Sequence, residues 1–126
     1  MNLDVISSKK APAAIGPYSQ AILAGRLLFC SGQIAIDPAT GEMVSDDIVT
    51  QTVQVLENIA GLLEAAQATL EDVAKTTIFL TDMDNFAAVN EVYGRYFGDH
   101  KPARSTVAVR SLPKGALIEI EVVAAL

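Results

Sequence analysis

The sequence predicts an α+β domain in which a six-stranded mixed sheet carries two helices on one face. Strand-like segments dominate both ends of the chain, two stretches with helical periodicity lie between them, and turn residues separate the segments. The expected element order is β-β-β-α-β-α-β-β. This order suits one sheet with both helices packed on the same side, because each helix must bury an apolar stripe.

Composition places the chain among folded, acidic proteins. Residues 1–126 are enough for a single domain with its own core, and 51% of them are hydrophobic, which excludes a disordered chain. The formal net charge is −6 and no run of Lys or Arg forms a patch, so a general nucleic-acid binder is disfavoured. The single cysteine, together with the lack of a signal-peptide pattern or a membrane-length apolar run, predicts a cytoplasmic protein.

The N-terminal third is expected to supply three strands. Residues 5–7 suit a short strand, and residues 21–24 and 27–30 flank Gly25-Arg26 as a hairpin. The second hairpin strand is expected to continue to Ile36. Proline and glycine make the segment before the hairpin a loop.

Two helices are expected, over residues 47–66 and 85–97, because apolar residues recur there at helical spacing. Thr69-Leu70-Glu71-Asp72 resembles a capping box ahead of a strand over 73–80. Residues 104–109 and 117–124 are expected to complete the chain as a hairpin. The expected buried stripes are Val49, Val53, Leu56, Ala60 and Leu63, widened by Ile48, Ile59 and Ala66, in the first helix, and Phe86, Val89, Tyr93 and Phe97 in the second.

One strand is apolar on both faces. Leu27, Leu28, Phe29 and Cys30 follow one another, so side chains on both sides of the sheet need burial. Two helices can cover only one face of a six-stranded sheet. The second face is therefore expected to pack against other copies of the chain, which predicts a homo-oligomer.

The last quarter of the chain carries the residues best suited to chemistry. Arg104 begins one expected strand, and Glu119 lies early in the next. A guanidinium matches a carboxylate in bidentate fashion, and a glutamate nearby can hold or activate a water. The pair suggests a small site for an anionic organic acid. By residue type alone, a solvated hairpin with ordinary surface charges explains the pattern better.

Several long blocks of the sequence resemble the RidA (YjgF) family. They occur in the order and with the spacing typical of that family, and together they cover nearly the whole chain. The blocks are residues 11–20 (APAAIGPYSQ), 31–34 (SGQI), 89–93 (VNEVY), 102–107 (PARSTV), 112–116 (LPKGA) and 118–121 (IEIE).

The resemblance implies a fold and an activity. The fold is chorismate-mutase-like, without chorismate mutase activity, and it assembles as a trimer whose sheets form a central barrel with clefts between subunits. Such family members hydrolyse 2-imino acids or their enamine tautomers, such as 2-iminobutanoate and 2-iminopropanoate, to 2-keto acids and ammonia. The resemblance implies no cofactor. None is needed to activate the substrate, because an iminium carbon is already electrophilic.

The resemblance also implies roles for individual residues. Arg104 resembles the family's carboxylate clamp, and Glu119 resembles the residue that orients or deprotonates the water. Tyr18 resembles the aromatic residue that lines the pocket. Ser31 and Gly32 lie where family members bring the chain close to the ligand. Each has a structural alternative. Arg104 could be a charge at a strand end, Glu119 a solvent-facing carboxylate and Tyr18 a core residue. Ser31 could serve a local turn and Gly32 a β-bulge.

Other polar residues carry weaker expectations. Asn90 belongs to a family block near the cleft and is expected to contact substrate, without a defined role. Thr106 stands where many family members have cysteine, so it would act through its backbone or its hydroxyl rather than as a thiol. Cys30 is expected to be a small buried hydrophobe. With His100 as the only histidine, no metal site is expected.

Two other classes of function remain open from the sequence. The same cleft could belong to a regulatory module that senses keto acids, although anion binding alone would need Arg104 and would leave Glu119 unexplained. Some family members are reported as translation inhibitors or chaperone-like proteins. The acidic character of this chain argues against contact with RNA.

Overall fold

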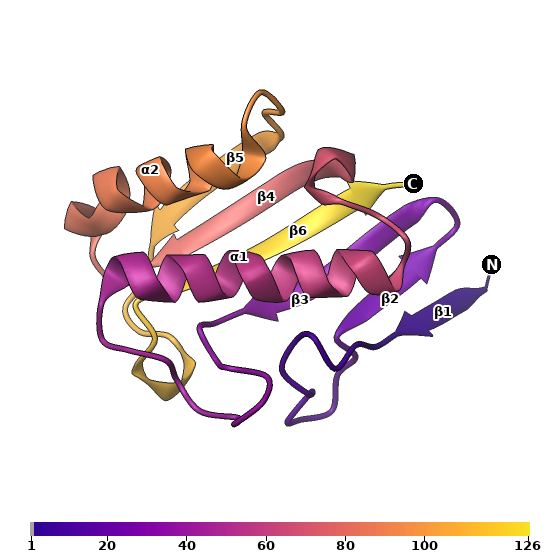
Figure 1. Ribbon diagram of the computed structural model, residues 1–126, viewed down its shortest axis with the longest axis horizontal. Helices are drawn as coiled ribbons and strands as arrows, with labels where there is room; N and C mark the ends of the chain where they lie inside the picture. Colours follow the sequence, from indigo (N-terminus) through magenta and orange to yellow (C-terminus); the bar gives the residue numbers. More distant parts are fainter. Residues whose placement is uncertain (1) are drawn as a thin grey trace.

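The computed structural model describes residues 2–126 and arranges them in two layers, a sheet and a pair of helices (Figure 1). Met1, which belongs to the domain expected over residues 1–126, lies outside the described residues. The elements in chain order are β1 (Leu3–Ile6), β2 (Ala21–Ala24), β3 (Leu27–Gln33), α1 (Ile48–Ala65), η1 (Leu70–Asp72), β4 (Val73–Leu80), η2 (Met83–Asn85), α2 (Phe86–Phe97), β5 (Ala103–Ala108), η3 (Pro113–Gly115) and β6 (Ile118–Ala125).

The six strands form one mixed sheet in the order β1-β2-β3-β6-β4-β5, and only the β4–β5 pair is parallel. The predicted α+β architecture, with six strands and two helices, is confirmed. Both helices lie on the same face of the sheet in Figure 1, α1 in front of β3 and β6 and α2 beside β4 and β5. A core of fully buried side chains fills the space between, including Leu28, Leu56, Ile78 and Ile120.

The expected hairpin between residues 104–109 and 117–124 is wrong. β6 pairs with β3 and β4, whereas β5 lies parallel to β4 at the edge of the sheet. Parallel neighbours need a crossover connection, and α2 supplies it between β4 and β5. β6 takes the central place because it carries alternate residues that are fully buried, while most of β5 is exposed.

Two strand boundaries differ from expectation. The first strand covers residues 3–6 rather than 5–7, and β3 ends at Gln33 rather than Ile36. Ser31 and Gly32 together oppose one residue of β6, so they form a β-bulge that bends the chain out of the ladder. Beyond the bulge, Ile36 makes only an isolated bridge with Met43.

α1 covers nearly the expected residues and confirms part of the expected stripe, because Leu56, Ile59 and Leu63 are buried. Asp47 caps its N-terminus by accepting a hydrogen bond from the Thr50 amide at 2.9 Å. Val49, expected to be buried, is 40% exposed. The sequence pattern was misleading because apolar residues occur around most of this helix, and polar side chains take inner positions where they can bond the backbone. The buried residues of α1 are Gln51, Thr52, Val55, Leu56, Asn58, Ile59, Gly61, Leu62 and Leu63.

The other predicted helix features are largely confirmed. Val89, Tyr93 and Phe97 of α2 are buried, and Phe86 packs against the core while partly exposed. The capping box at Thr69 is present over the single turn of η1. Within residues 2–126, neither α1 nor α2 combines the length and apolar character needed to cross a membrane.

The second face of the sheet is apolar and uncovered in the isolated chain. Leu3, Val5, Leu27, Phe29 and Val107 lie on this face, which we call the open face, and are between 43% and 66% exposed. Their strand partners place them opposite the side that the helices cover. The prediction that the helices leave one face of a doubly apolar strand unburied is therefore confirmed.

Candidate active site

The charged residues singled out from the sequence lie on opposite faces of the sheet. Glu119 sits between Ile118 and Ile120, both buried under the helices, so its side chain belongs to the open face. Arg104 pairs in register with Thr76, which is fully buried on the helix face. Within one chain, the sheet itself separates the carboxylate from the guanidinium.

Glu119 borders a cavity of about 210 Å³. Tyr18 from the N-terminal loop, Gly32 from the bulge and Lys114 from η3 line the same cavity. Most of the remaining wall is aliphatic, with Ile15 and Ile34 among its residues. The cavity thus offers a carboxylate beside an apolar space large enough for a small organic acid.

The bulge in β3 makes room for the Glu119 carboxylate. A Cβ atom at position 32 would collide with the end of the Glu119 side chain, so a larger residue there would force the carboxylate to move. The close approach of backbone and side chain is a common use of glycine. The sequence left a bulge and a ligand contact as alternatives for Gly32, and the structure shows that the bulge is real.

Partial burial raises the pKa of the Glu119 carboxyl, and the negative charge of Glu121 raises it further. Glu121 lies two residues along the same strand and so shares the open face, as strand parity predicted. A carboxylate with a raised pKa is a stronger proton acceptor than an ordinary surface glutamate. It therefore suits a general base better than an ordinary surface glutamate does.

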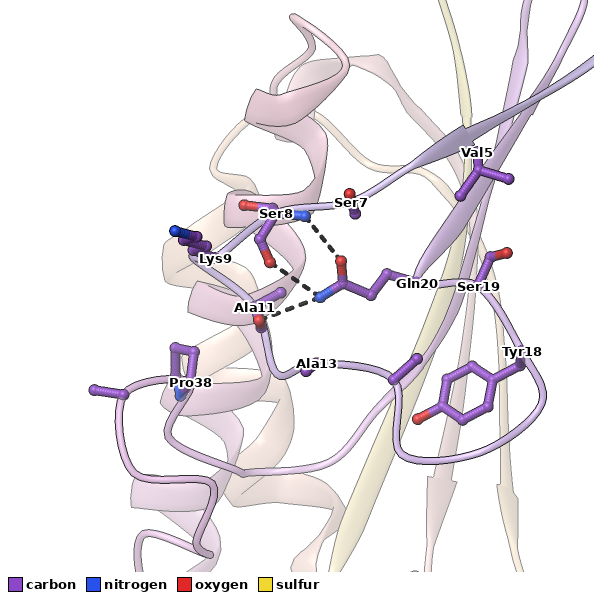
Figure 2. Close-up of a pocket in the computed structure, with 12 residues that line it drawn as sticks. Val5, Ser7, Ser8, Lys9, Ala11, Ala13, Tyr18, Ser19, Gln20 and Pro38 are labelled. Carbon is purple, nitrogen blue, oxygen red and sulfur yellow. Dashed lines mark hydrogen bonds between the residues drawn. The ribbon is translucent and has the colours of Figure 1, made fainter.

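The loop that carries Tyr18 is held by Gln20, a buried residue that sequence reasoning missed. Its Nε2 group donates to the carbonyl oxygens of Ser8 (3.1 Å), Ala11 (3.2 Å) and Pro12 (2.7 Å), and its Oε1 atom accepts from the Ser8 amide at 2.8 Å. Figure 2 shows Gln20 reaching across the loop while Tyr18 stands on its outer turn. Tyr18 remains 51% exposed at the cavity rim, so it is not a core residue.

Ser31 joins the same loop to the sheet. Its hydroxyl donates to the carbonyl of Ser19 at 2.6 Å, and its amide donates to the carbonyl of Gln20 at 2.9 Å. Both groups are therefore engaged in the isolated chain. The broad groove of about 870 Å³ in Figure 2 lies against this loop, and neither Glu119 nor Arg104 is among the residues that line it.

On the helix face, Arg104 is held by residues of α2. Its Nη1 atom donates to the Asn90 Oδ1 atom at 2.8 Å. Its Cζ atom lies 5.0 Å from the ring centre of Tyr93 and 5.5 Å from that of Phe86. A cavity of about 400 Å³ adjoins this group and is also lined by Lys101. Two cationic side chains make this cavity suitable for an anion.

Three further polar residues have defined surroundings. Thr106 follows Arg104 on the helix face, and its buried hydroxyl oxygen has no hydrogen-bond partner among the described residues. Cys30 is buried, as expected for a small hydrophobic residue, and burial raises its pKa to about 12. His100 places Nε2 2.7 Å from the Val73 carbonyl oxygen. Residues 2–126 contain no cluster of three acidic, histidine or cysteine side chains placed to hold a metal.

Sequence reasoning missed Lys114 and understated Tyr93. Lys114 adopts a left-handed backbone with a φ of 57°, which is uncommon outside glycine, and its position between Pro113 and Gly115 was the available signal. Tyr93 was assigned only to the buried stripe of its helix. Its hydroxyl could have indicated more, because a buried tyrosine usually finds a polar partner.

The structure belongs to the two-layer α+β class, with a bulge-supported glutamate on one face of the sheet and a helix-held arginine on the other. The family model described as Endoribonuclease L-PSP matches residues 8–126. A RutC family protein of Pyrococcus horikoshii is 60% identical over 121 residues, which cover 96% of each chain. The chain therefore belongs to the Endoribonuclease L-PSP family, known as RidA or YjgF, as its sequence blocks predicted.

Other similar proteins include some whose names describe an activity or a ligand. The 2-iminobutanoate/2-iminopropanoate deaminase of Homo sapiens is 48% identical over 120 residues, covering 95% of this chain and 88% of the human one. A Rid family structure from Yersinia pestis has a TM-score of 0.97 at 52% identity, covering 99% and 100% of the two chains. The structure of E. coli TdcF with bound serine has a TM-score of 0.93 at 41% identity, covering 98% of each chain.

Proposed function

We propose that this protein hydrolyses 2-imino acids and their enamine tautomers, with 2-iminobutanoate and 2-iminopropanoate as substrates, to 2-keto acids and ammonia. The observation that carries the proposal is Glu119, a half-buried carboxylate of raised pKa beside a small, mostly apolar cavity. Relatives named as deaminases at about half identity support the reaction class. A related structure with bound serine supports a small amino-acid-like ligand. The reaction needs no cofactor.

The proposed site lies between copies of the chain, because one copy cannot bring Arg104 and Glu119 to the same small molecule. The open face with its exposed Leu27 and Phe29 provides an apolar surface for assembly. We propose a homotrimer in which these faces form a central barrel. Arg104 of one subunit, near the edge of its sheet, then faces Glu119 of a neighbour.

The proposed chemistry assigns each residue one task. Arg104 binds the substrate carboxylate with its fork of donors. Glu119 accepts a proton from water as the oxygen bonds to the electrophilic C2 atom of the iminium. Glu119 then gives this proton to the nitrogen of the carbinolamine. The C–N bond breaks as the hydroxyl group returns a proton to Glu119, so that ammonia departs and the 2-keto acid remains. An enamine joins the same route once C3 is protonated.

The test couples a threonine dehydratase to release of 2-ketobutanoate, with and without the protein. The wild type is expected to accelerate release, and Arg104→Ala is expected to raise KM roughly 10- to 100-fold, the scale of a hydrogen bond to a charged group. Keto-acid binding without acceleration would instead favour a regulatory module. Unchanged release and no binding would contradict both functions.

Hybrid oligomers test the shared site directly. Subunits carrying Arg104→Ala and subunits carrying Glu119→Gln are each expected to be nearly inactive alone. Refolded together in equal amounts, they should regain activity in about a quarter of the sites, because some interfaces then pair an intact arginine with an intact glutamate. No recovery in mixed trimers of confirmed composition would place both residues in one subunit's site.

A further inference from the structure

We propose that Tyr93 is a positioning residue that fixes the Arg104 guanidinium before any substrate arrives. The inference deepens the proposed function, because it concerns the arginine that would bind the substrate carboxylate. Arg104 is on an exposed edge strand, where a long side chain would ordinarily move among many rotamers. Its surroundings on α2 restrict it to one arrangement.

The restraint comes from one face of a single helix. Phe86, Asn90 and Tyr93 are spaced four and then three residues apart, so they share a side of α2. Both aromatic rings lie within the distance at which a cation is attracted to a ring, 5.0 Å for Tyr93 and 5.5 Å for Phe86. Asn90 fixes one end of the guanidinium through its 2.8 Å hydrogen bond.

Tyr93 is itself immobilised by the strand next to Arg104. Its hydroxyl lies 2.8 Å from the Thr76 Oγ1 atom in a buried hydrogen bond, and its side chain is only 8% exposed. Thr76 is the register partner of Arg104 across the β4–β5 pair. The sheet thus holds the tyrosine, and the tyrosine ring supports the arginine that belongs to the neighbouring strand.

The arrangement leaves the guanidinium able to bind an anion. A guanidinium has five N–H donors, and Asn90 accepts from Nη1 in the only hydrogen bond that the Arg104 side chain makes with the described residues. The remaining donors can form the planar fork that binds a carboxylate at two points. Because orientation is set in advance, binding of the substrate loses less side-chain entropy.

The test compares Tyr93→Leu and Tyr93→Phe with a tyrosine on the same helix that serves another partner. Tyr96 donates from its hydroxyl to Glu57 at 2.8 Å, so Tyr96→Leu is the matched control for lost packing. Tyr93→Leu is expected to raise KM, and the Kd for 2-ketobutanoate, about tenfold while kcat changes little. Tyr93→Phe keeps the ring and should recover most of this loss, and Tyr96→Leu should leave both constants near wild type.

A readout that needs no turnover separates this inference from the proposed function. The NMR order parameter of the Arg104 Nε–H group should fall in Tyr93→Leu and in Asn90→Ala, and should stay unchanged in Tyr96→Leu. If that order parameter and the Kd are the same in Tyr93→Leu and Tyr96→Leu, Tyr93 does not position Arg104. If Tyr93→Leu fails to fold, Tyr93→Met, which keeps an apolar side chain but removes the ring, decides by the same order parameter. If the order parameter falls in Tyr93→Leu but the wild type shows no deaminase activity, the positioning role is supported and the proposed reaction is contradicted.

Discussion

Glu119 owes its chemical character to its immediate neighbours. Two aliphatic strand neighbours turn it to the open face, the glycine bulge beside it leaves room for its carboxylate, and partial burial together with Glu121 raises its pKa. A glutamate on an ordinary exposed strand has none of these features. The local environment therefore turns a common surface residue into a candidate general base.

Glu119 should control the acid side of the pH–rate profile. Because its pKa is raised, the carboxylate is protonated and inactive at pH values where an ordinary glutamate is ionised, so kcat/KM should rise with pH through a midpoint above the usual glutamate range. Glu121→Gln removes the repelling charge and should move that midpoint to lower pH. Glu119→Gln should lower kcat about 100-fold with little change in KM. An acid limb that persists unchanged in Glu119→Gln would assign the base to another group.

α1 is stabilised by polar side chains as well as apolar ones. Asn58 is fully buried, donates to the carbonyl of Ile36 at 2.9 Å and accepts from Gln54 at 2.8 Å. Ile36 follows the point where β3 leaves the sheet, and its backbone lies in a buried region. The asparagine thus satisfies a carbonyl that the ladder no longer reaches.

Replacing Asn58 should destabilise the fold more than replacing an apolar residue on the outer side of the same helix. Asn58→Ala leaves the buried Ile36 carbonyl without its partner and should lower the free energy of unfolding by about 1–3 kcal/mol. Val49→Ala, at a position predicted to be buried but found exposed, should change it by about 0.5 kcal/mol or less. Urea unfolding of the three proteins measures both values. A larger loss of unfolding free energy for Val49→Ala than for Asn58→Ala would contradict the exposed position of Val49 and support the stripe expected from the sequence.

The molecule as a whole has one covered and one uncovered face, and this asymmetry predicts its assembly. The wild type should sediment as a trimer at micromolar concentration, because the open face otherwise leaves several large apolar side chains in water. Phe29→Asp places a charge on that face and should shift the protein toward monomers and abolish the proposed shared site. Val49→Asp, on the exposed side of α1, is the matched control and should remain trimeric. A monomeric wild type would contradict the prediction.

The sequence by itself determined the number and type of the elements, the family and the uncovered sheet face. These follow from local periodicity, from ordered motif blocks and from four consecutive apolar residues at Leu27 to Cys30, all of which are properties of neighbouring residues. Burial of Cys30 and the cap at Thr69 were predictable for the same reason.

Only the tertiary structure decided which strands pair and which side chains meet. The parallel pairing of β4 and β5, the inward phase of α1, and the placement of Arg104 and Glu119 on opposite faces depend on contacts between residues far apart in the chain. Periodicity assigns a side chain to a face of its own element, but not to a neighbour across space. The support of Arg104 by Tyr93 and Asn90 is of this second kind, because it requires a helix and an edge strand to pack together.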